Sequence, residues 1–185
     1  MARVHLAWKD WGAFAAAVSL AFTAVLASSG APQVPASCPV TIPSEHPFTP
    51  PPPYPSSPPF PNTGWIGTPA LWTAISADGI YRGLKVEGGY RNKIFWWRAG
   101  YDGSAEPRPA LSLTATRLDV TAEPVVVRDA TNASSADLGG WTMLVMPDIP
   151  AAGCWRLTGS YNDASVSYVV WVDSKDAPRP LTGRR

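Results

Sequence analysis

Histidine, cysteine and charged residues are scarce in this 185-residue chain, and their scarcity excludes several kinds of site. Only His5 and His46 are present, and no G-x-S-x-G elbow accompanies them, so a Ser-His-Asp triad has no obvious candidate. The chain also has no H-E-x-x-H, no C-x-x-C and no phosphate-cradling glycine-rich loop. We therefore expect no catalytic residues, no metal site and no cofactor, and a protein that is not an enzyme.

Net charge is the second thing the chain lacks. Charged residues make up 16% of the sequence, and the formal net charge is +1. Removal of residues 1–27 takes away Arg3, Lys9 and Asp10 and leaves 13 basic and 13 acidic residues. A neutral chain has no overall field that attracts nucleic acid or an anionic membrane, so neither is expected as a partner.

Carboxylates remain as candidates for acid–base chemistry. The aspartates, however, fall in stretches typical of turns, where Asp commonly bonds its own backbone. These residues are Asp78, Asp102, Asp119, Asp129, Asp148 and Asp163. We expect them to form turns rather than an active site.

The segment D-A-T-N-A-S-S-A-D, residues 129–137, has oxygen ligands at spacings that could wrap a calcium ion. It fits no established calcium-loop pattern. We therefore predict a solvated loop here.

The N-terminus has the pattern of an export signal. Arg3 and Lys9 precede an uncharged run of 17 residues, Trp11 to Ala27, and small residues follow it. This order predicts a secretory signal peptide over 1–27, cleaved after Ala27, with an uncleaved membrane anchor as the alternative. Either way, the protein is expected outside the cytoplasm, secreted or associated with the cell envelope.

The two cysteines, Cys38 and Cys154, both lie beyond the signal. An even count in an exported chain favours a disulfide, which here would close a loop of 115 intervening residues. In the chain-entropy model such a closure contributes on the order of 4–5 kcal/mol. Lipidation of Cys38 is not expected, because ten residues separate it from the apolar run and Pro35 holds the usual leucine position.

Proline dominates the next segment, since residues 32–61 contain 13 prolines. Proline disfavours helices and central strands, so we predict an extended polyproline II arm. Phe48, Tyr54 and Phe60 recur every six residues, which places them on one side of such a rod. A simple spacer has no need for an aromatic stripe.

From Trp65 onward, short β-rich runs alternate with turn residues. We predict strands near 70–76, 80–87, 92–98, 110–118, 123–128, 140–146, 153–159 and 165–173. About eight strands without helical periodicity predict an all-β fold, an antiparallel Ig-like β-sandwich. The expected domains are the signal (1–27), the Pro-rich arm (28–64), the sandwich (65–174) and a flexible tail (175–185).

Side-chain alternation on the strands raises a conflict in K-I-F-W-W-R, residues 93–98. Neighbouring residues point to opposite faces, so Ile94 and Trp96 share one face while Phe95 and Trp97 share the other. A sandwich has only one inner face per sheet, so Trp97 and, on the last strand, Trp171 are expected on outer faces. In the final hairpin the same rule turns Trp155 inward and Cys154 outward, within reach of the arm.

Three explanations compete for the outer face of Lys93, Phe95, Trp97, Arg98 and Trp171. Its aromatic rings could stack on sugars, as in a carbohydrate-binding module. They could form a docking face for an unknown protein or cell-envelope partner. We favour the third explanation, in which the Pro-rich arm covers them, because proline-rich segments dock well in aromatic grooves.

Six separated motifs carry a resemblance to a known group of proteins. They are C-P-V-T (38–41), A-L-W-T (70–73), D-G (78–79), K-I-F-W-W-R (93–98), R-L-D (117–119) and P-A-A-G-C-W-R-L-T-G (150–159). In this order, over roughly 38–173, they resemble a group of uncharacterised exported bacterial proteins. The resemblance implies export and pairing of the two cysteines, but no activity. We expect a non-catalytic binding or structural role at the bacterial cell envelope, with a carbohydrate-binding module as the alternative.

Overall fold

The structure is a computed structural model that describes residues 33–174. The predicted signal (1–27), the first residues of the arm and the predicted tail (175–185) lie outside the described residues. The described arm and sandwich belong to one compact unit.

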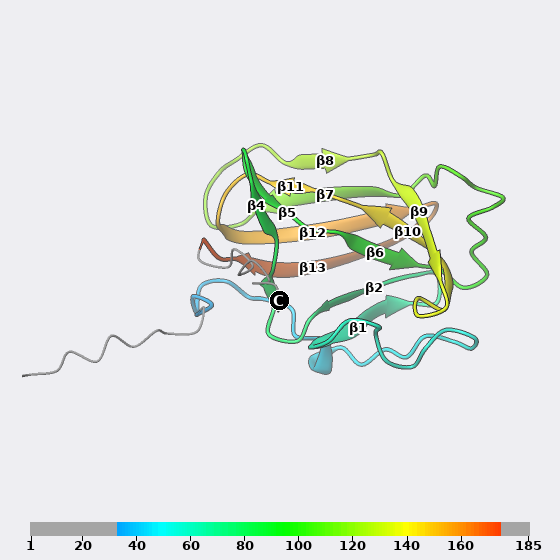
Figure 1. The fold of residues 1–185 in the computed structure, drawn as a ribbon. Coiled ribbons are helices and arrows are strands. Elements are labelled where there is room, and N and C mark those ends of the chain that lie inside the picture. The colour runs from blue at the N-terminus through cyan, green and yellow to red at the C-terminus, as the bar shows by residue number, and fades with distance from the viewer. Residues whose placement is uncertain (1–32, 175–185) are drawn as a thin grey trace, which may run out of the picture. The chain divides into compact units, whose positions relative to one another are not determined.

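The described chain is all-β, and most of its strands form two five-stranded sheets (Figure 1). The first sheet has the order β1-β2-β6-β10-β9. Its strands are β1 (Thr63–Thr68), β2 (Leu71–Ser76), β6 (Ile94–Trp97), β9 (Thr131–Ser135) and β10 (Gly140–Val145). The second sheet has the order β3-β13-β12-β7-β8. Its strands are β3 (Ile80–Tyr81), β7 (Ser112–Arg117), β8 (Val125–Val127), β12 (Gly153–Tyr161) and β13 (Ala164–Val172).

A small third sheet, of order β11-β5-β4, stands at one end of the other two (Figure 1). It contains β4 (Leu84–Val86), β5 (Gly89–Arg91) and β11 (Asp148–Ile149). Buried Tyr90 and Ile149 of this sheet join the main core. The small sheet therefore closes that end of the core.

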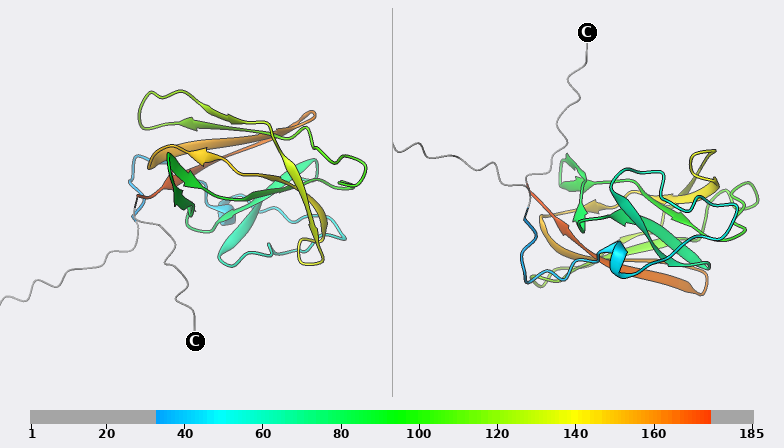
Figure 2. Two further views of the ribbon diagram at one scale, coloured as in Figure 1. Left: turned by 45° about the horizontal axis from the view of Figure 1, so that its top comes forward. Right: turned by 90° about the horizontal axis from the view of Figure 1, so that it is seen from below.

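The two large sheets face each other as layers of a β-sandwich (Figure 2). Strict alternation of side chains supplies the core between them. The first sheet contributes Ile66, Leu71, Ile75, Ile94, Trp96, Met143 and Val145; the second contributes Leu113, Ala115, Trp155, Leu157, Tyr168, Val170 and Val172. The predicted inward direction of Trp96 and Trp155 agrees with this packing.

Trp96 is among the largest fully buried side chains of the core, and a glycine makes room for it. Its indole is fully buried and lies against β12 at Gly159. A Cβ atom at Gly159 would be 2.3 Å from the Trp96 ring. The absence of a side chain at Gly159 thus allows the two sheets to approach across the indole.

The all-β prediction is confirmed, but the strands are more numerous than expected and most of them are shorter. The predicted strand 80–87 is divided at Gly83 into β3, which joins the second sheet, and β4, which joins the small sheet. Four strands were not predicted: β1, β5, β9 and β11. The pairing of β3 with β13 is parallel, whereas an antiparallel sheet was predicted.

The polar segment 129–137 is not the solvated loop that the sequence predicts. Thr131–Ser135 forms the edge strand β9, paired antiparallel with β10. Its low β-propensity is overridden by pairing with the apolar strand β10. Within residues 33–174, no group of three or more His, Cys, Asp or Glu side chains lies close enough to hold a metal ion.

The Pro-rich arm is not a straight polyproline rod. It contains a 3-10 turn, η1 (Pro43–Glu45), and a second turn in which the Tyr54 amide donates to the Pro51 carbonyl at 3.1 Å. The Pro52–Pro53 peptide bond is cis. In Figure 1 the arm, coloured blue to cyan, follows the outside of β1 and β2 instead of leading away from them.

Helix is limited to η1 in the described part of the chain. No helix between residues 33 and 174 has the length and apolar character needed to cross a membrane.

The Trp96–Gly159 contact leads to a stability prediction. We expect Gly159→Ala to lower the free energy of unfolding by about 1–3 kcal/mol, because the new methyl group overpacks a fully buried indole. Urea unfolding followed by circular dichroism measures this change. Ser160→Ala, on the same strand, is the matched control and should change the value by less than about 0.5 kcal/mol. An equally small effect of Gly159→Ala would contradict the described packing.

Candidate binding face and cavity

Three tryptophans form a layer on the outer face of the first sheet. Trp65 on β1, Trp72 on β2 and Trp97 on β6 are buried and cluster with Leu138. Trp72 and Trp97 are directly paired in the β2–β6 register, and the Trp65 and Trp97 rings meet edge to face at 4.8 Å. This layer lies on the side of the sheet opposite Trp96 and the core.

Aromatic residues of the arm lie on this layer. Phe48 and Tyr54 both contact the Trp72 ring, with ring centroids 5.8 and 5.0 Å away. Phe60 packs against Phe95 at 5.1 Å. The aromatic stripe of the arm and the aromatic face of the sheet are therefore in contact over their length.

Polar contacts fix the position of the arm and of the loop beside it. The Tyr54 hydroxyl donates to the backbone carbonyl of Arg98 at 2.8 Å, and the Trp97 Nε1–H donates to the Leu138 carbonyl at 3.0 Å. The buried Nε1 atoms of Trp65 and Trp72 have no hydrogen-bond partner among the described residues. Contact with the arm is thus mainly apolar and aromatic.

The beginning of the described arm packs on the other sheet. The predicted disulfide is confirmed: Cys38 and Cys154 are bonded, with their Cα atoms 5.6 Å apart. Both cysteines and Val169 are buried on the outer face of the second sheet, where Val34, Val40 and Trp171 pack against them. The outward direction of Cys154 predicted from the hairpin agrees with this arrangement.

Backbone contacts continue this attachment at the edge of the second sheet. The Thr41 amide donates to the Val169 carbonyl at 2.9 Å, and the Val169 amide donates to the Thr41 hydroxyl at 2.9 Å. Thr41 thereby pairs with β13, whose edge would otherwise offer open donors and acceptors. The arm then continues to the outer face of the first sheet.

The structure does not bring the five predicted face residues together. Phe95 and Trp97 lie on the outer face of the first sheet, and Trp171 lies on the outer face of the second. The Arg98 guanidinium lies 5.6 Å from the centre of the Tyr161 ring, and Lys93 is exposed. Trp171 is half-buried beside the disulfide, where it packs with residues 34–40 and not with the part of the arm that contains Phe48, Tyr54 and Phe60.

This separation bears on the sugar-binding alternative. A sugar platform needs exposed rings in one plane, but Trp97 is fully buried and Trp171 belongs to the other sheet. Trp141 is the most exposed indole of the described residues, at 37%. It packs against Gly103, away from the predicted pair.

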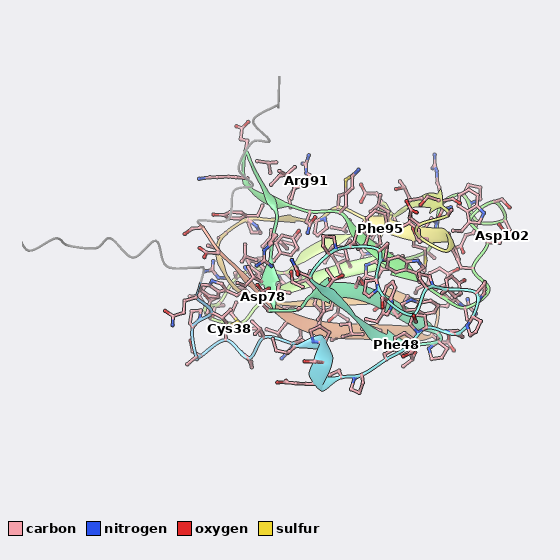
Figure 3. All side chains as sticks on the ribbon, turned by 60° about the horizontal axis from the view of Figure 1, so that its bottom comes forward. Cys38, Phe48, Asp78, Arg91, Phe95 and Asp102 are labelled. Atoms are coloured by element: carbon pink, nitrogen blue, oxygen red, sulfur yellow. A yellow bond between two sulfur atoms is a disulfide. The ribbon has the colours of Figure 1, made fainter. Side chains whose placement is uncertain are left out.

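The aspartates are engaged in turns and ion pairs. Asp78 accepts from the Ile80 amide, and Asp102 accepts from the Ser104 amide, as the turn prediction requires. Asp148 departs from that prediction because it lies in β11, where its carboxylate pairs with Arg91 at 2.6 Å. Figure 3 shows Asp78 and Asp102 at opposite ends of the molecule, so they form no common site.

Arginine partners stabilise the charged form of three aspartates. Hydrogen bonds from Arg82, Arg117 and Arg91 lower the pKa of the carboxyl group of Asp78, Asp119 and Asp148, respectively.

Two tyrosines and Glu106 form a polar network beside β9. The Tyr101 hydroxyl donates to Asn132 Oδ1 at 2.5 Å, and the Tyr161 hydroxyl donates to the Glu106 carboxylate. Burial, followed by the charge of Glu106, raises the pKa of Tyr101 to about 12. These contacts attach the 101–110 segment to β9 and to the end of β12.

A cavity of about 330 Å³ opens beside the end of the arm. Its walls come from Phe60 and Pro61 of the arm and from β1, β2, β3, β6 and β13 with the segment before β6. Lys93 and Phe95, two of the predicted face residues, are among its lining residues. This volume lies at the lower end of the range typical of small-molecule sites.

Comparisons with known proteins identify no relative. No family model, no curated protein and no solved structure matches the chain.

Several residues of the face and the cavity were not predicted from the sequence as site residues. Trp72 alternates with Leu71 and Thr73 in A-L-W-T, so the rule that placed Trp97 outside would also have placed Trp72 there. Trp65 was assigned to the boundary of the domain because β1 was not recognised. Tyr81 and Arg82 of the cavity carry no signal in the local sequence, since the cavity is assembled from distant segments.

The buried tyrosines predict a loss of stability at alkaline pH. Burial raises the pKa of Tyr81, Tyr101 and Tyr168 above the usual value of 10. Above pH 10 these groups ionise in the unfolded chain but stay protonated in the folded one, so stability falls as pH rises from 10 toward the folded pKa values. Below pH 10 this contribution is fully present.

We expect the free energy of unfolding, measured with urea, to be flat between pH 8 and 9 and to decline above pH 10. Tyr101→Phe should make that decline shallower, because one of the shifted groups is removed. The plateau between pH 8 and 9 serves as the internal reference for each protein. A decline equally steep in Tyr101→Phe would contradict the described environment of Tyr101.

Proposed function

We propose that this protein is an exported, non-catalytic binding or structural protein of the bacterial cell envelope. The single observation that carries the proposal is the arm, which is joined to one sheet by a disulfide and lies with its aromatic residues on the other. A disulfide that closes so long a loop is typical of oxidising compartments outside the cytoplasm. The charged start and the uncharged run of residues 1–27 also support export, because they have the pattern of a signal peptide.

The proposal assigns the arm a structural role as a cover. Without it, Trp65, Trp72 and Trp97 would form a contiguous apolar patch, which soluble proteins rarely leave exposed. Phe48, Tyr54 and Phe60 occupy the position that a proline-rich partner would take in an aromatic groove. The arm thus acts as an internal ligand of the sheet, and Trp65, Trp72 and Trp97 are not left open to partners.

The ordered motifs from C-P-V-T to G-C-W support membership of the exported bacterial group that they resemble. We also propose that the sandwich is Ig-like. The chain passes repeatedly between the sheets, since β6 is followed by β7 and β8 in the second sheet and by β9 and β10 in the first. Such crossings, together with antiparallel hairpins, support a Greek-key arrangement.

A non-catalytic role is supported by the state of the acidic groups. Asp78, Asp119 and Asp148 each face an arginine within 2.8 Å. A general acid needs a carboxyl group whose pKa is raised, but the pKa of each of these groups is lowered.

Export is tested with a reporter that is active only outside the cytoplasm. We expect a C-terminal fusion of the full chain to alkaline phosphatase to be active in bacteria, and deletion of residues 2–27 to abolish that activity. Immunoblotting provides the control for equal expression of the two fusions. An inactive full-length fusion at equal expression would refute export.

The cover role of the arm is tested by removing its rings. We expect the combined substitution of Phe48, Tyr54 and Phe60 by serine to lower the free energy of unfolding by about 3–6 kcal/mol, at roughly 1–2 kcal/mol per half-buried ring. Acrylamide should also quench tryptophan fluorescence more strongly, because Trp72 loses its covering residues.

The matched control replaces three exposed residues of the same arm, Thr49, Ser56 and Ser57, by alanine. This variant should unfold and quench like the unmodified protein. Equal quenching of the serine variant and the control would rule out the arm as the cover of this face.

A further inference from the structure

The cavity beside the end of the arm combines an apolar interior with a basic mouth. Buried Ile75, Ile80, Ile94, Tyr168 and Val170 line its inner part, where the two sheets separate. Arg82 and Lys93 also line it and are exposed, so they lie at its solvent side. An entering molecule would therefore meet cations at the mouth and apolar side chains inside.

The charged residues that line this cavity are both cations. Two cations and no carboxylate are among its lining residues. The charge of Arg82 is shared with Asp78 through two short hydrogen bonds, while Lys93 has no ion-pair partner among residues 33–174. Lys93 thus provides an ammonium group for an external anion.

Polar groups beside these cations also favour an anionic ligand. Asn92 and Ser76 line the cavity beside the cations. Tyr81 also lines the cavity. Its buried hydroxyl lies near the Asn92 backbone but makes no hydrogen bond with it. The cavity thus has hydrogen-bond donors and cations on one side and aliphatic side chains on the other. This arrangement suits a ligand with one polar, anionic end and one apolar end.

The arm provides one wall of the cavity. Phe60 and Phe95 both line it and are in ring contact at 5.1 Å. Phe60 is the last aromatic residue of the arm, so docking of the arm and completion of the cavity depend on the same ring. Phe48, the first aromatic residue of the arm, and Phe95, both labelled in Figure 3, pack on the same outer-face cluster as Phe60.

We propose that this cavity binds an amphipathic anion: a compact apolar or aromatic body with a single carboxylate, sulfonate or phosphate that is bound by Lys93. The inference deepens the proposed function and rests on it only in taking the protein's role to be binding. The anionic head lies at the mouth with Lys93 and Arg82, and the apolar body lies between Phe60, Phe95 and the aliphatic interior.

The test compares a pair of fluorescent probes that differ in charge. 1-Anilinonaphthalene-8-sulfonate carries a sulfonate, and N-phenyl-1-naphthylamine is its neutral counterpart. We expect the full chain to bind the sulfonate with a Kd below about 1 mM and at least fivefold more tightly than the neutral probe.

Variants assign that binding to the cavity. Lys93→Gln should weaken sulfonate binding about fivefold to tenfold and leave neutral-probe binding unchanged, whereas Lys93→Arg should retain it. Lys85→Gln is the matched control, since Lys85 is an exposed cation on β4 that does not line the cavity. Phe60→Ala should weaken both probes, because it removes a wall rather than a charge.

Competition identifies the chemistry of the head group. Dodecanoate or dodecyl phosphate should displace the sulfonate probe at lower concentration than dodecanol does. The tighter of the two anions indicates whether a carboxylate or a phosphate is preferred. The proposal is overturned if the two probes bind equally, if Lys93→Gln has no effect, or if no binding occurs up to about 1 mM. These titrations use purified protein and are independent of the export reporter. A failure of ligand binding therefore does not contradict export, and a failure of export does not contradict ligand binding.

Discussion

Two adjacent tryptophans on one strand cannot enter the same core, and much of this molecule is organised around that constraint. On β6, Trp96 fills the space between the two sheets, while Trp97 is directed to the opposite side. The second indole is fully buried all the same. A two-layer sandwich therefore needs a third, partial layer here, and residues 48–60 with Leu138 provide it.

The same arm meets a similar need on the second sheet. Cys154 alternates with the inward Trp155 and is buried on the outer face, where Cys38, Val40 and Trp171 pack with it. Each sheet thus buries apolar residues on both faces, which is unusual for an antiparallel sheet with one solvated side. The disulfide limits how far the arm can depart, and this raises the effective concentration of its aromatic residues at the first sheet.

How much of this could be read from the sequence depends on the range of the interactions involved. Alternation within a strand is local, so the inward and outward directions of Trp96, Trp97 and Cys154 were predicted. The edge strand β9 was not, because its T-N-A-S-S sequence has little β-propensity and is held by its neighbour β10. The separation of Trp171 from Trp97 was also not predicted, because alternation states which face a residue occupies but not which sheet contains the strand. The arm was expected to be an extended rod, but turns at Pro43–Glu45 and at residues 51–54 bend it.

The cavity was not predictable for a related reason, and it also connects the arm to the two sheets. Its lining comes from the arm and from five strands of the two large sheets, so no local sequence pattern predicts it. Phe60 belongs at once to the docked arm and to the wall of the cavity. A change that loosens the arm would therefore open the cavity, and a molecule that fills the cavity would contact Phe60 and favour the docked arm. Because such coupling is reciprocal, the arm is part of the binding site and not only its scaffold.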